Sequence, residues 1–202
     1  MPKNKTRLIL ASQSAVRHAM LQNAGLTFDI IPAAIDEKSI IEDLQKKETT
    51  PAQMALILSK EKALAVAEKN PEALVIGCDQ ILEMNGQIIF KANNETDAKD
   101  KLRSLRGKSH RLISAASVAK GEKILWQHSD EAILAMRDFD EEFLEKYCKK
   151  APQALTRAVG AYELESAGSW LFSEIQGDYF TILGLPLLPL LSYLHDNHGF
   201  GP

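Results

Sequence analysis

The feature that most constrains the fold is a continuous apolar run at residues 73–79, Ala-Leu-Val-Ile-Gly-Cys-Asp, which ends on an acid. A strand with one solvated face would alternate polar and apolar residues, and this run does not. It therefore predicts a central strand covered on both faces, with Asp79 at its end. Ligands of open α/β sheets bind beyond the carboxyl ends of strands, so Asp79 is a functional candidate. It could bind Mg²⁺ or accept a proton from water, or it could merely cap the following turn.

The segments around this run mix helix and strand signals. Thr50, Pro51 and Gln53 form a capping box with proline at the first helical position, which predicts a helix over residues 51–70. Asn85-Gly86 predicts a type I′ hairpin. Further helices are predicted at 14–24, 96–105, 140–149 and from 187 onward, and strands at 7–12, 28–32, 81–84, 87–90, 110–119, 123–136, 169–174 and 179–183. This mixture predicts an α/β or α+β protein with a mixed sheet.

Composition excludes several classes of protein. The chain has 202 residues, a formal net charge of -3 and only two cysteines. The charge argues against a protein that coats nucleic acid through a basic surface, so no nucleic acid polymer is expected as a partner. Two cysteines are too few for a disulfide scaffold or a four-cysteine zinc site. No segment has the length of a membrane span or a signal-peptide core, which favours a cytoplasmic protein without a membrane partner.

A candidate anion site follows the first predicted strand. Ser12 and Ser14 stand in a short loop before a helix, and Arg17 lies one turn into that helix. A helix N-terminus offers unpaired backbone N–H groups and the positive end of the helix dipole, which bind anions. Arg17 could reach the same anion with its guanidinium. The alternative is that Ser14 only caps the helix and Arg17 is solvated.

Four other charged residues could each either take part in a site or simply be solvated. Lys62 falls in or beside the apolar stripe of its helix, so it could extend to water or point into a cleft and bind phosphate. Asp36 and Glu37 are adjacent acids in a predicted loop, and they matter only if another carboxylate lies close to them. Lys91 follows a predicted hairpin strand and could line the same cleft or simply be exposed.

Taken together, these segments resemble the Maf family of nucleoside triphosphate pyrophosphatases. Each motif is short, but nine of them occur in the family's order over nearly the whole chain. They are Leu-Ile-Leu-Ala-Ser-Gln-Ser at 8–14 with Arg17, Asp36-Glu37, Lys-Glu-Lys-Ala at 60–63, Val-Ile-Gly-Cys-Asp-Gln at 75–80, Lys91, Leu-Arg-Gly-Lys-Ser-His at 105–110, Val-Gly-Ala-Tyr at 159–162, Ile-Gln-Gly-Asp-Tyr-Phe at 175–180 and Gly-Leu-Pro-Leu at 184–187.

The resemblance implies an α/β fold, with an elongated mixed β-sheet flanked by helices and two lobes around a nucleotide-binding cleft. It implies one domain over residues 1–202 that hydrolyses a nucleoside triphosphate to the monophosphate and pyrophosphate. It also implies a divalent cation (Mg²⁺, Mn²⁺ or Co²⁺), a homodimer and a possible role in removing modified nucleotides.

The resemblance also assigns roles to single residues. Catalytic roles fall to three of them: Asp79 as proton acceptor, Glu37 and Lys62. Glu37 and Asp79 would hold the metal. Substrate-binding roles fall to Ser12, Ser14, Arg17, Lys91 and Glu165.

Three positions depart from the family pattern. Ala15 and Val16 replace a proline and an arginine in the phosphate loop, and Ala92 replaces a proline after Lys91. Glu165, followed by Ser166, resembles the branch of the family associated with 7-methyl-GTP rather than with dTTP and UTP. A carboxylate only accepts hydrogen bonds, so it would select a base that presents donors.

Two other functions remain open at this point. The protein could be a nucleotide-binding regulator of cell division or septum formation with little turnover, which the missing loop arginine favours slightly. It could also be a phosphotransferase with a similar cleft, which would form orthophosphate or a phosphorylated product instead of pyrophosphate.

Overall fold

The computed structural model describes residues 6–202, which divide into two compact units. The first unit comprises the chain up to Asp79, residues 114–130 and residues 184–202. The second comprises residues 80–113 and 131–183. Each unit is described by itself below.

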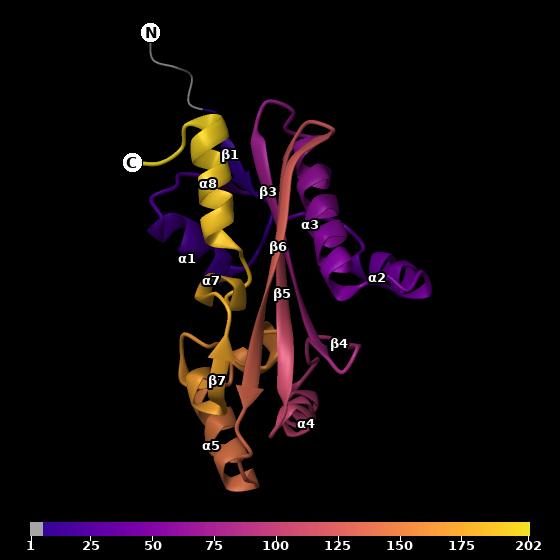
Figure 1. The fold of residues 1–202 in the computed structure, drawn as a ribbon, viewed down its shortest axis with the longest axis vertical. Helices are drawn as coiled ribbons and strands as arrows, with labels where there is room; N and C mark the ends of the chain where they lie inside the picture. Colours follow the sequence, from indigo (N-terminus) through magenta and orange to yellow (C-terminus); the bar gives the residue numbers. More distant parts are fainter. Residues whose placement is uncertain (1–5) are drawn as a thin grey trace. The chain divides into compact units, whose positions relative to one another are not determined.

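The helices and strands follow one another in a mixed order (Figure 1). The strands are β1 (Leu8–Leu10), β2 (Asp29–Ile30), β3 (Leu74–Met84), β4 (Gln87–Ile89), β5 (Ser109–Lys120), β6 (Lys123–Met136) and β7 (Phe172–Gln176). The helices are α1 (Ala15–Asn23), α2 (Glu37–Lys46), α3 (Pro51–Ala67), α4 (Glu95–Leu105), α5 (Glu141–Lys150), α6 (Ala154–Arg157), the 3-10 helix η1 (Ala167–Leu171), α7 (Tyr179–Ile182) and α8 (Leu187–His198).

The strands form one open, mixed sheet of seven strands. Its order is β2-β1-β3-β5-β6-β7, and β4 pairs with β3. β1 is parallel to both β2 and β3, whereas β4 and β7 are antiparallel to β3 and β6. The expected α/β fold with a mixed sheet flanked by helices is therefore confirmed.

In the first unit, helix α3 packs directly on strand β3. Successive residues of a strand face opposite sides, so Val75, Gly77 and Asp79 share the face that α3 covers. A Cβ at Gly77 would lie 2.2 Å from the backbone oxygen of Ser59 and 2.5 Å from the backbone nitrogen of Ala63. The missing side chain at Gly77 thus allows the helix backbone to approach the strand.

Apolar side chains fix the same helix along its length. The hydrophobic cluster beneath it joins residues of α3, β1, β3 and β5 with the residue after β1 and the residue before β3: Ile9, Ala11, Ala63, Val66, Ala67, Ala73, Val75 and Ala119. Helix α3 begins as the sequence predicts, because Thr50 and Gln53 form the capping box and Pro51 is the first helical residue. Packing and cap together set the rotation of the helix and hence the direction in which Lys62 projects.

The second unit has its own core, built around α4, α5 and the strands that they cover. Leu82, Leu102, Leu134, Leu144 and Phe172 belong to it. The predicted hairpin is present: Met84 pairs with Gln87 across the turn, in which Asn85 and Gly86 both have positive φ. This core anchors the loops that carry Lys91 and Glu165.

Three sequence-based expectations about elements are wrong, and the strand expected at 169–174 is wrong in its first half, because residues 169–171 belong to η1 and β7 begins at Phe172. The apolar strand does not end at Asp79, because β3 continues to Met84 and includes the first arm of the hairpin. Residues 179–183 are not a strand, since Tyr179–Ile182 form helix α7 with Asp178 as its cap. The acids Asp36 and Glu37 do not lie in a loop, because they begin helix α2.

Helices long and apolar enough to cross a membrane are absent from the described residues 6–202.

Candidate functional site

The strand–loop–helix at the N-terminus of the first unit forms a polar niche. Ser14 caps α1, its Oγ accepting a hydrogen bond from the backbone N–H of Arg17 at 3.3 Å. Ser12 is buried, and its Oγ accepts from the backbone N–H of Ser14 at 3.2 Å. The first-turn N–H groups of Ala15 and Val16 have no acceptor within the helix, as at any helix start. The niche therefore has the donor groups and helix dipole of an anion site.

Arg17 is not solvated, in contrast to one of the two readings of the sequence. Its Nε donates to the backbone oxygen of Gly184 at 2.7 Å, and its Nη1 donates to Ser12 Oγ at 3.3 Å and to the backbone oxygen of Cys78 at 3.4 Å. Gly184 has φ +101, and a Cβ there would meet the guanidinium at 3.2 Å. Arg17 thus ties the α1 helix to β3 beside Asp79, a role that the sequence analysis missed. The only signal for it was the glycine of the 184–187 segment.

Lys62, Asp79 and Glu37 meet in the same unit. The Nζ of Lys62 lies 2.6 Å from Asp79 Oδ1 and 3.0 Å from Glu37 Oε2. Lys62 and Asp79 are nearly enclosed, with side chains 12% and 9% exposed, whereas Glu37 is half exposed. Two features bring these side chains together. Gly77 allows α3, which carries Lys62, to pack closely on β3, which carries Asp79, and Glu37 is the first residue of helix α2.

Asp36, which precedes Glu37, caps a helix and does not contact Lys62 in the ion pairs that the described residues form. Asp36 caps α2, and its Oδ1 accepts from the backbone N–H of Ser39 at 3.1 Å. Of the two adjacent acids, therefore, only Glu37 joins the cluster.

Burial raises the pKa of Asp79 above its usual range. Lys62 and Arg17 oppose this rise because their positive charges favour the carboxylate, while the nearby charge of Glu37 adds to it. A carboxylate with a raised pKa is a stronger proton acceptor than an exposed aspartate. The same low-dielectric setting strengthens the attraction between Asp79 and Lys62.

The donor set suits a divalent cation that is partly coordinated by a substrate. Carboxylate oxygens of Glu37 and Asp79 both lie beside the Nζ of Lys62, and both are hard ligands. Among the residues that the structure describes, no three His, Cys, Asp or Glu side chains are grouped to hold a metal. Mg²⁺ commonly binds one or two carboxylates and takes further oxygens from phosphates, so two carboxylates fit this group.

Lys91 and Glu165 belong to the second unit. Lys91 is exposed and follows β4, and the next residue, Ala92, is buried in the core of the second unit. Glu165 is exposed and lies between Tyr162, which is buried, and η1. Both side chains remain predicted substrate-binding groups.

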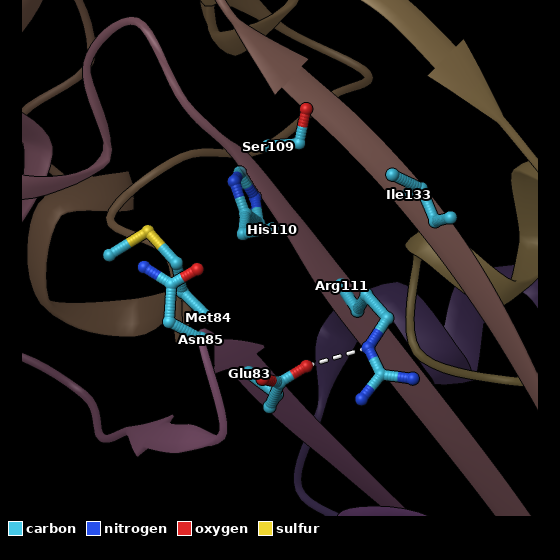
Figure 2. Close-up of a pocket in the computed structure, with 7 residues that line it drawn as sticks. All are labelled: Glu83, Met84, Asn85, Ser109, His110, Arg111 and Ile133. Atoms are coloured by element: carbon cyan, nitrogen blue, oxygen red, sulfur yellow. Dashed lines mark hydrogen bonds and ion pairs between the residues drawn. The ribbon is translucent and has the colours of Figure 1, made fainter.

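The second unit also contains a pocket of about 170 Å³ that holds none of the predicted site residues (Figure 2). Its lining includes Arg111, whose Nε donates to Glu83 at 2.6 Å and whose Nη1 donates to Glu131 at 3.1 Å. His110 also lines it. Its Nε2 bonds the hydroxyl of Tyr162 at 2.6 Å, and burial lowers its pKa to about 4. The arginine is thus already neutralised by carboxylates and the histidine is uncharged at neutral pH.

The first unit thus combines a lysine–carboxylate cluster with the N-terminus of helix α1, and these supply cationic donors and hard oxygen ligands of the kind that phosphate groups and divalent cations bind. Comparison with known families defines the class further. The chain belongs to the family described as Maf-like protein, whose sequence model matches residues 7–197.

Individual relatives match over most of their length. A 7-methyl-GTP pyrophosphatase of Brucella abortus biovar 1 (strain 9-941) is 44% identical over 188 residues, which are 93% of this chain and 94% of that protein. A nucleoside triphosphate pyrophosphatase of Paramagnetospirillum magneticum (strain ATCC 700264 / AMB-1) is 42% identical over 94% of this chain and 97% of that protein. Among solved structures, a HAM1 protein from Coxiella burnetii has a TM-score of 0.42 and 14% identity over 66% of this chain and 74% of that chain. A structural likeness of that size carries no argument about activity.

Proposed function

We propose that this protein hydrolyses nucleoside triphosphates to the monophosphate and pyrophosphate. The observation that carries the proposal is the cluster of Lys62, Asp79 and Glu37 in the unit that also holds the Ser12–Arg17 niche. The names of its relatives at 42–44% identity, over more than nine-tenths of the chain, support the same reaction.

Binding of the triphosphate would fall to the cations and the helix start. A triphosphate carries about four negative charges, and Arg17, Lys62 and the N-terminus of α1 supply positive potential. Among the described residues, two of the three ammonium donors of Lys62 meet carboxylates, which leaves the third for a phosphate oxygen.

Asp79 would accept the proton of the attacking water. The water oxygen would form a bond to the α-phosphorus, and the bond from that phosphorus to the bridging oxygen would break. The pyrophosphate would then leave with the electron pair. A divalent cation held by Glu37 and Asp79 would neutralise phosphate charge and lower the pKa of bound water. The buried, raised-pKa carboxyl of Asp79 suits the role of proton acceptor.

The base is the finer part of the proposal. Glu165 would accept hydrogen bonds from a base that presents N–H donors, as guanine does on its pairing edge. Several relatives named 7-methyl-GTP pyrophosphatase support a guanine nucleotide, including modified ones. Removal of modified nucleotides would be the corresponding cellular role.

Three further parts of the proposal come from the resemblance. The protein would act as a homodimer, both units would belong to one domain over residues 1–202, and the enzyme would work in the cytoplasm. The family match across residues 7–197 supports the second of these.

The test is pyrophosphate release from a panel of canonical and modified triphosphates with Mg²⁺, Mn²⁺ or Co²⁺. Asp79→Asn should lose at least a hundredfold in kcat, the lower range for a lost general base. Asp43→Asn is the matched control, because Asp43 is exposed and pairs only with Lys46 among the partners the structure shows. Glu165→Gln should change the ratio of kcat/KM between guanine and uracil triphosphates.

Each alternative function predicts a different outcome of this panel. Orthophosphate or a phosphorylated product would indicate a phosphotransferase. Tight nucleotide binding without turnover would favour the regulator of cell division. No product from any triphosphate with any of the three metals would refute the proposed reaction.

A further inference from the structure

Lys101 on α4 donates to backbone carbonyls from two separate loops of the second unit. Its Nζ bonds the carbonyl oxygen of Phe90 and, at 2.9 Å, the carbonyl oxygen of Val159. Phe90 immediately precedes Lys91, and Val159 lies six residues before Glu165. These two loops carry the predicted substrate-binding side chains of this unit.

The contacts of Lys101 are unusual for a helix-surface lysine. Lys99, two residues earlier, forms ordinary ion pairs with Glu95 at 3.1 Å and Glu145 at 2.8 Å. Lys101 is half-buried instead, and burial lowers its pKa to about 8. An ammonium group that loses water needs other acceptors, and here neutral peptide carbonyls provide them. Lys101 therefore links two loops through their backbone carbonyls and does not form an ion pair among the contacts of the described residues.

The loop that carries Lys91 is fixed on both sides of that residue. Lys101 holds Phe90 before it, and Ala92 is buried in the core after it. The backbone N–H of Asn93 and its side-chain amide both donate to Asp97 in the first turn of α4, at 3.3 and 3.2 Å. The backbone of Lys91 is thus set by α4, while its side chain extends from an exposed position.

The loop that leads to Glu165 is fixed at successive points after Val159. The carbonyl of Ala161 accepts from the Tyr147 hydroxyl at 2.9 Å. The hydroxyl of Tyr162 bonds His110 at 2.6 Å. Val159 is therefore the first of several points at which the segment leading to Glu165 is held, and its restraint, Lys101, also contacts the Lys91 loop.

We propose that Lys101 is a positioning residue that fixes the Lys91 loop and the Glu165 loop relative to each other, and thereby sets substrate affinity and base selectivity. The functional part rests on the proposed pyrophosphatase reaction. Lys101 acts through the backbone of the two loops, whose carbonyls accept from two of its three ammonium donors, so it is a positioning residue and not a catalytic one. Its effect is preorganisation: two recognition groups held in place bind a ligand without a further ordering cost.

The test compares Lys101→Met, which keeps the length of the side chain but removes its donors, with Lys101→Arg, which restores donors and charge. Lys99→Met is the matched control on the same helix. In Lys101→Met the KM for the preferred triphosphate should rise about tenfold with kcat changed less than threefold. The kcat/KM ratio between guanine and uracil triphosphates should fall toward one. Lys101→Arg should recover most of both effects, and Lys99→Met should show neither.

A readout that needs no activity is amide hydrogen exchange. Exchange in residues 90–94 and 158–166 should accelerate together in Lys101→Met, by about tenfold, and should stay unchanged there in Lys99→Met. If the wild-type protein releases no pyrophosphate, the proposed function fails, and exchange still decides the positioning role.

Two results would overturn the inference. One is a drop in kcat for all substrates with unchanged KM and selectivity, which is the effect of a smaller folded fraction. The other is exchange that is unchanged in both loops, or equally faster throughout the protein.

Discussion

At the scale of single residues, the proposed reaction depends on a charged pair that is largely removed from water. The Nζ of Lys62 lies 2.6 Å from Asp79 Oδ1, and both side chains have little exposure to solvent. Removing one partner of such a pair leaves an uncompensated buried charge. Two opposing influences therefore act on Asp79: burial, which raises its pKa, and Lys62, which lowers it.

The titration of Asp79 tests this balance. In the substrate-free protein, the pKa of Asp79 should lie above the usual value for aspartate of about 3.9. In Lys62→Met it should rise further, because the cation that favours the carboxylate is gone. As pH falls through this raised pKa, Asp79 gains a proton and can no longer accept one from water. Carboxyl ¹³C shifts measure the value, and Asp79→Asn identifies the signal.

Lys60→Met is the control for this titration, since Lys60 lies on the same helix and is not among the groups that shift Asp79. Its Asp79 pKa should equal that of the wild type. An Asp79 pKa that is unchanged or lower in Lys62→Met would contradict the electrostatic account.

The sequence predicted where these residues lie on their helices, but it did not predict their hydrogen-bond and ion-pair partners. Helical spacing put Lys62 on the inner face of α3 but left two destinations open, and the structure places its ammonium on Asp79 and Glu37. Arg17 was expected to be solvated or to face an anion, yet it donates to Gly184 and Cys78. Backbone carbonyls carry no signature in the sequence, so bonds to them could not be predicted. The same holds for Lys101.

At the scale of elements, the contact of α3 with β3 through Gly77 brings the site together. Gly77→Ala should lower the free energy of unfolding by about 1–3 kcal/mol, the usual range for overpacking, because the two nearest of the three atoms that the new Cβ meets belong to the backbone. It should also displace Lys62 from Asp79 and lower kcat. Urea unfolding and turnover measure the two effects.

The control for Gly77→Ala is Gly86→Ala. A Cβ at Gly86 meets nothing within 4 Å, so only its positive φ should cost stability, about 1 kcal/mol, and turnover should be kept. A Gly77→Ala protein with wild-type stability and activity would show that the close approach is not needed.

Elements were predicted well where capping or turn residues mark them, and poorly where the element has only a few residues. The cap and proline of α3 predicted its first residue correctly, although the helix ends at Ala67 rather than at residue 70, and the Asn85-Gly86 turn was predicted correctly. Helix α7 has only four residues, and short apolar runs do not separate helix from strand by period. Helix α2 was missed although Asp36 is a favourable N-cap. The break assigned after Asp79 was wrong because the polar side chain interrupts the apolar pattern without interrupting the strand.

At the scale of the whole molecule, the order of motifs along the chain predicted the α/β class and the mixed sheet, and both are confirmed. Strand order was not predicted, because pairing between distant strands depends on packing that periodicity does not encode. The net charge of -3 also bears on substrate binding, because it disfavours the approach of an anion. A polyanionic substrate would have to be held by a few placed cations and a divalent metal against the overall charge.

In the proposed reaction, Asp79 directs water to the α-phosphorus of a nucleoside triphosphate. Hydrolysis in ¹⁸O-labelled water, with mass spectrometry of both products, tests it most directly. Attack at the α-phosphorus should give one ¹⁸O atom in the nucleoside monophosphate and none in the pyrophosphate, and Asp79→Asn should form almost no product. Label in the pyrophosphate or in orthophosphate, or labelled monophosphate formed at the wild-type rate by Asp79→Asn, would contradict it.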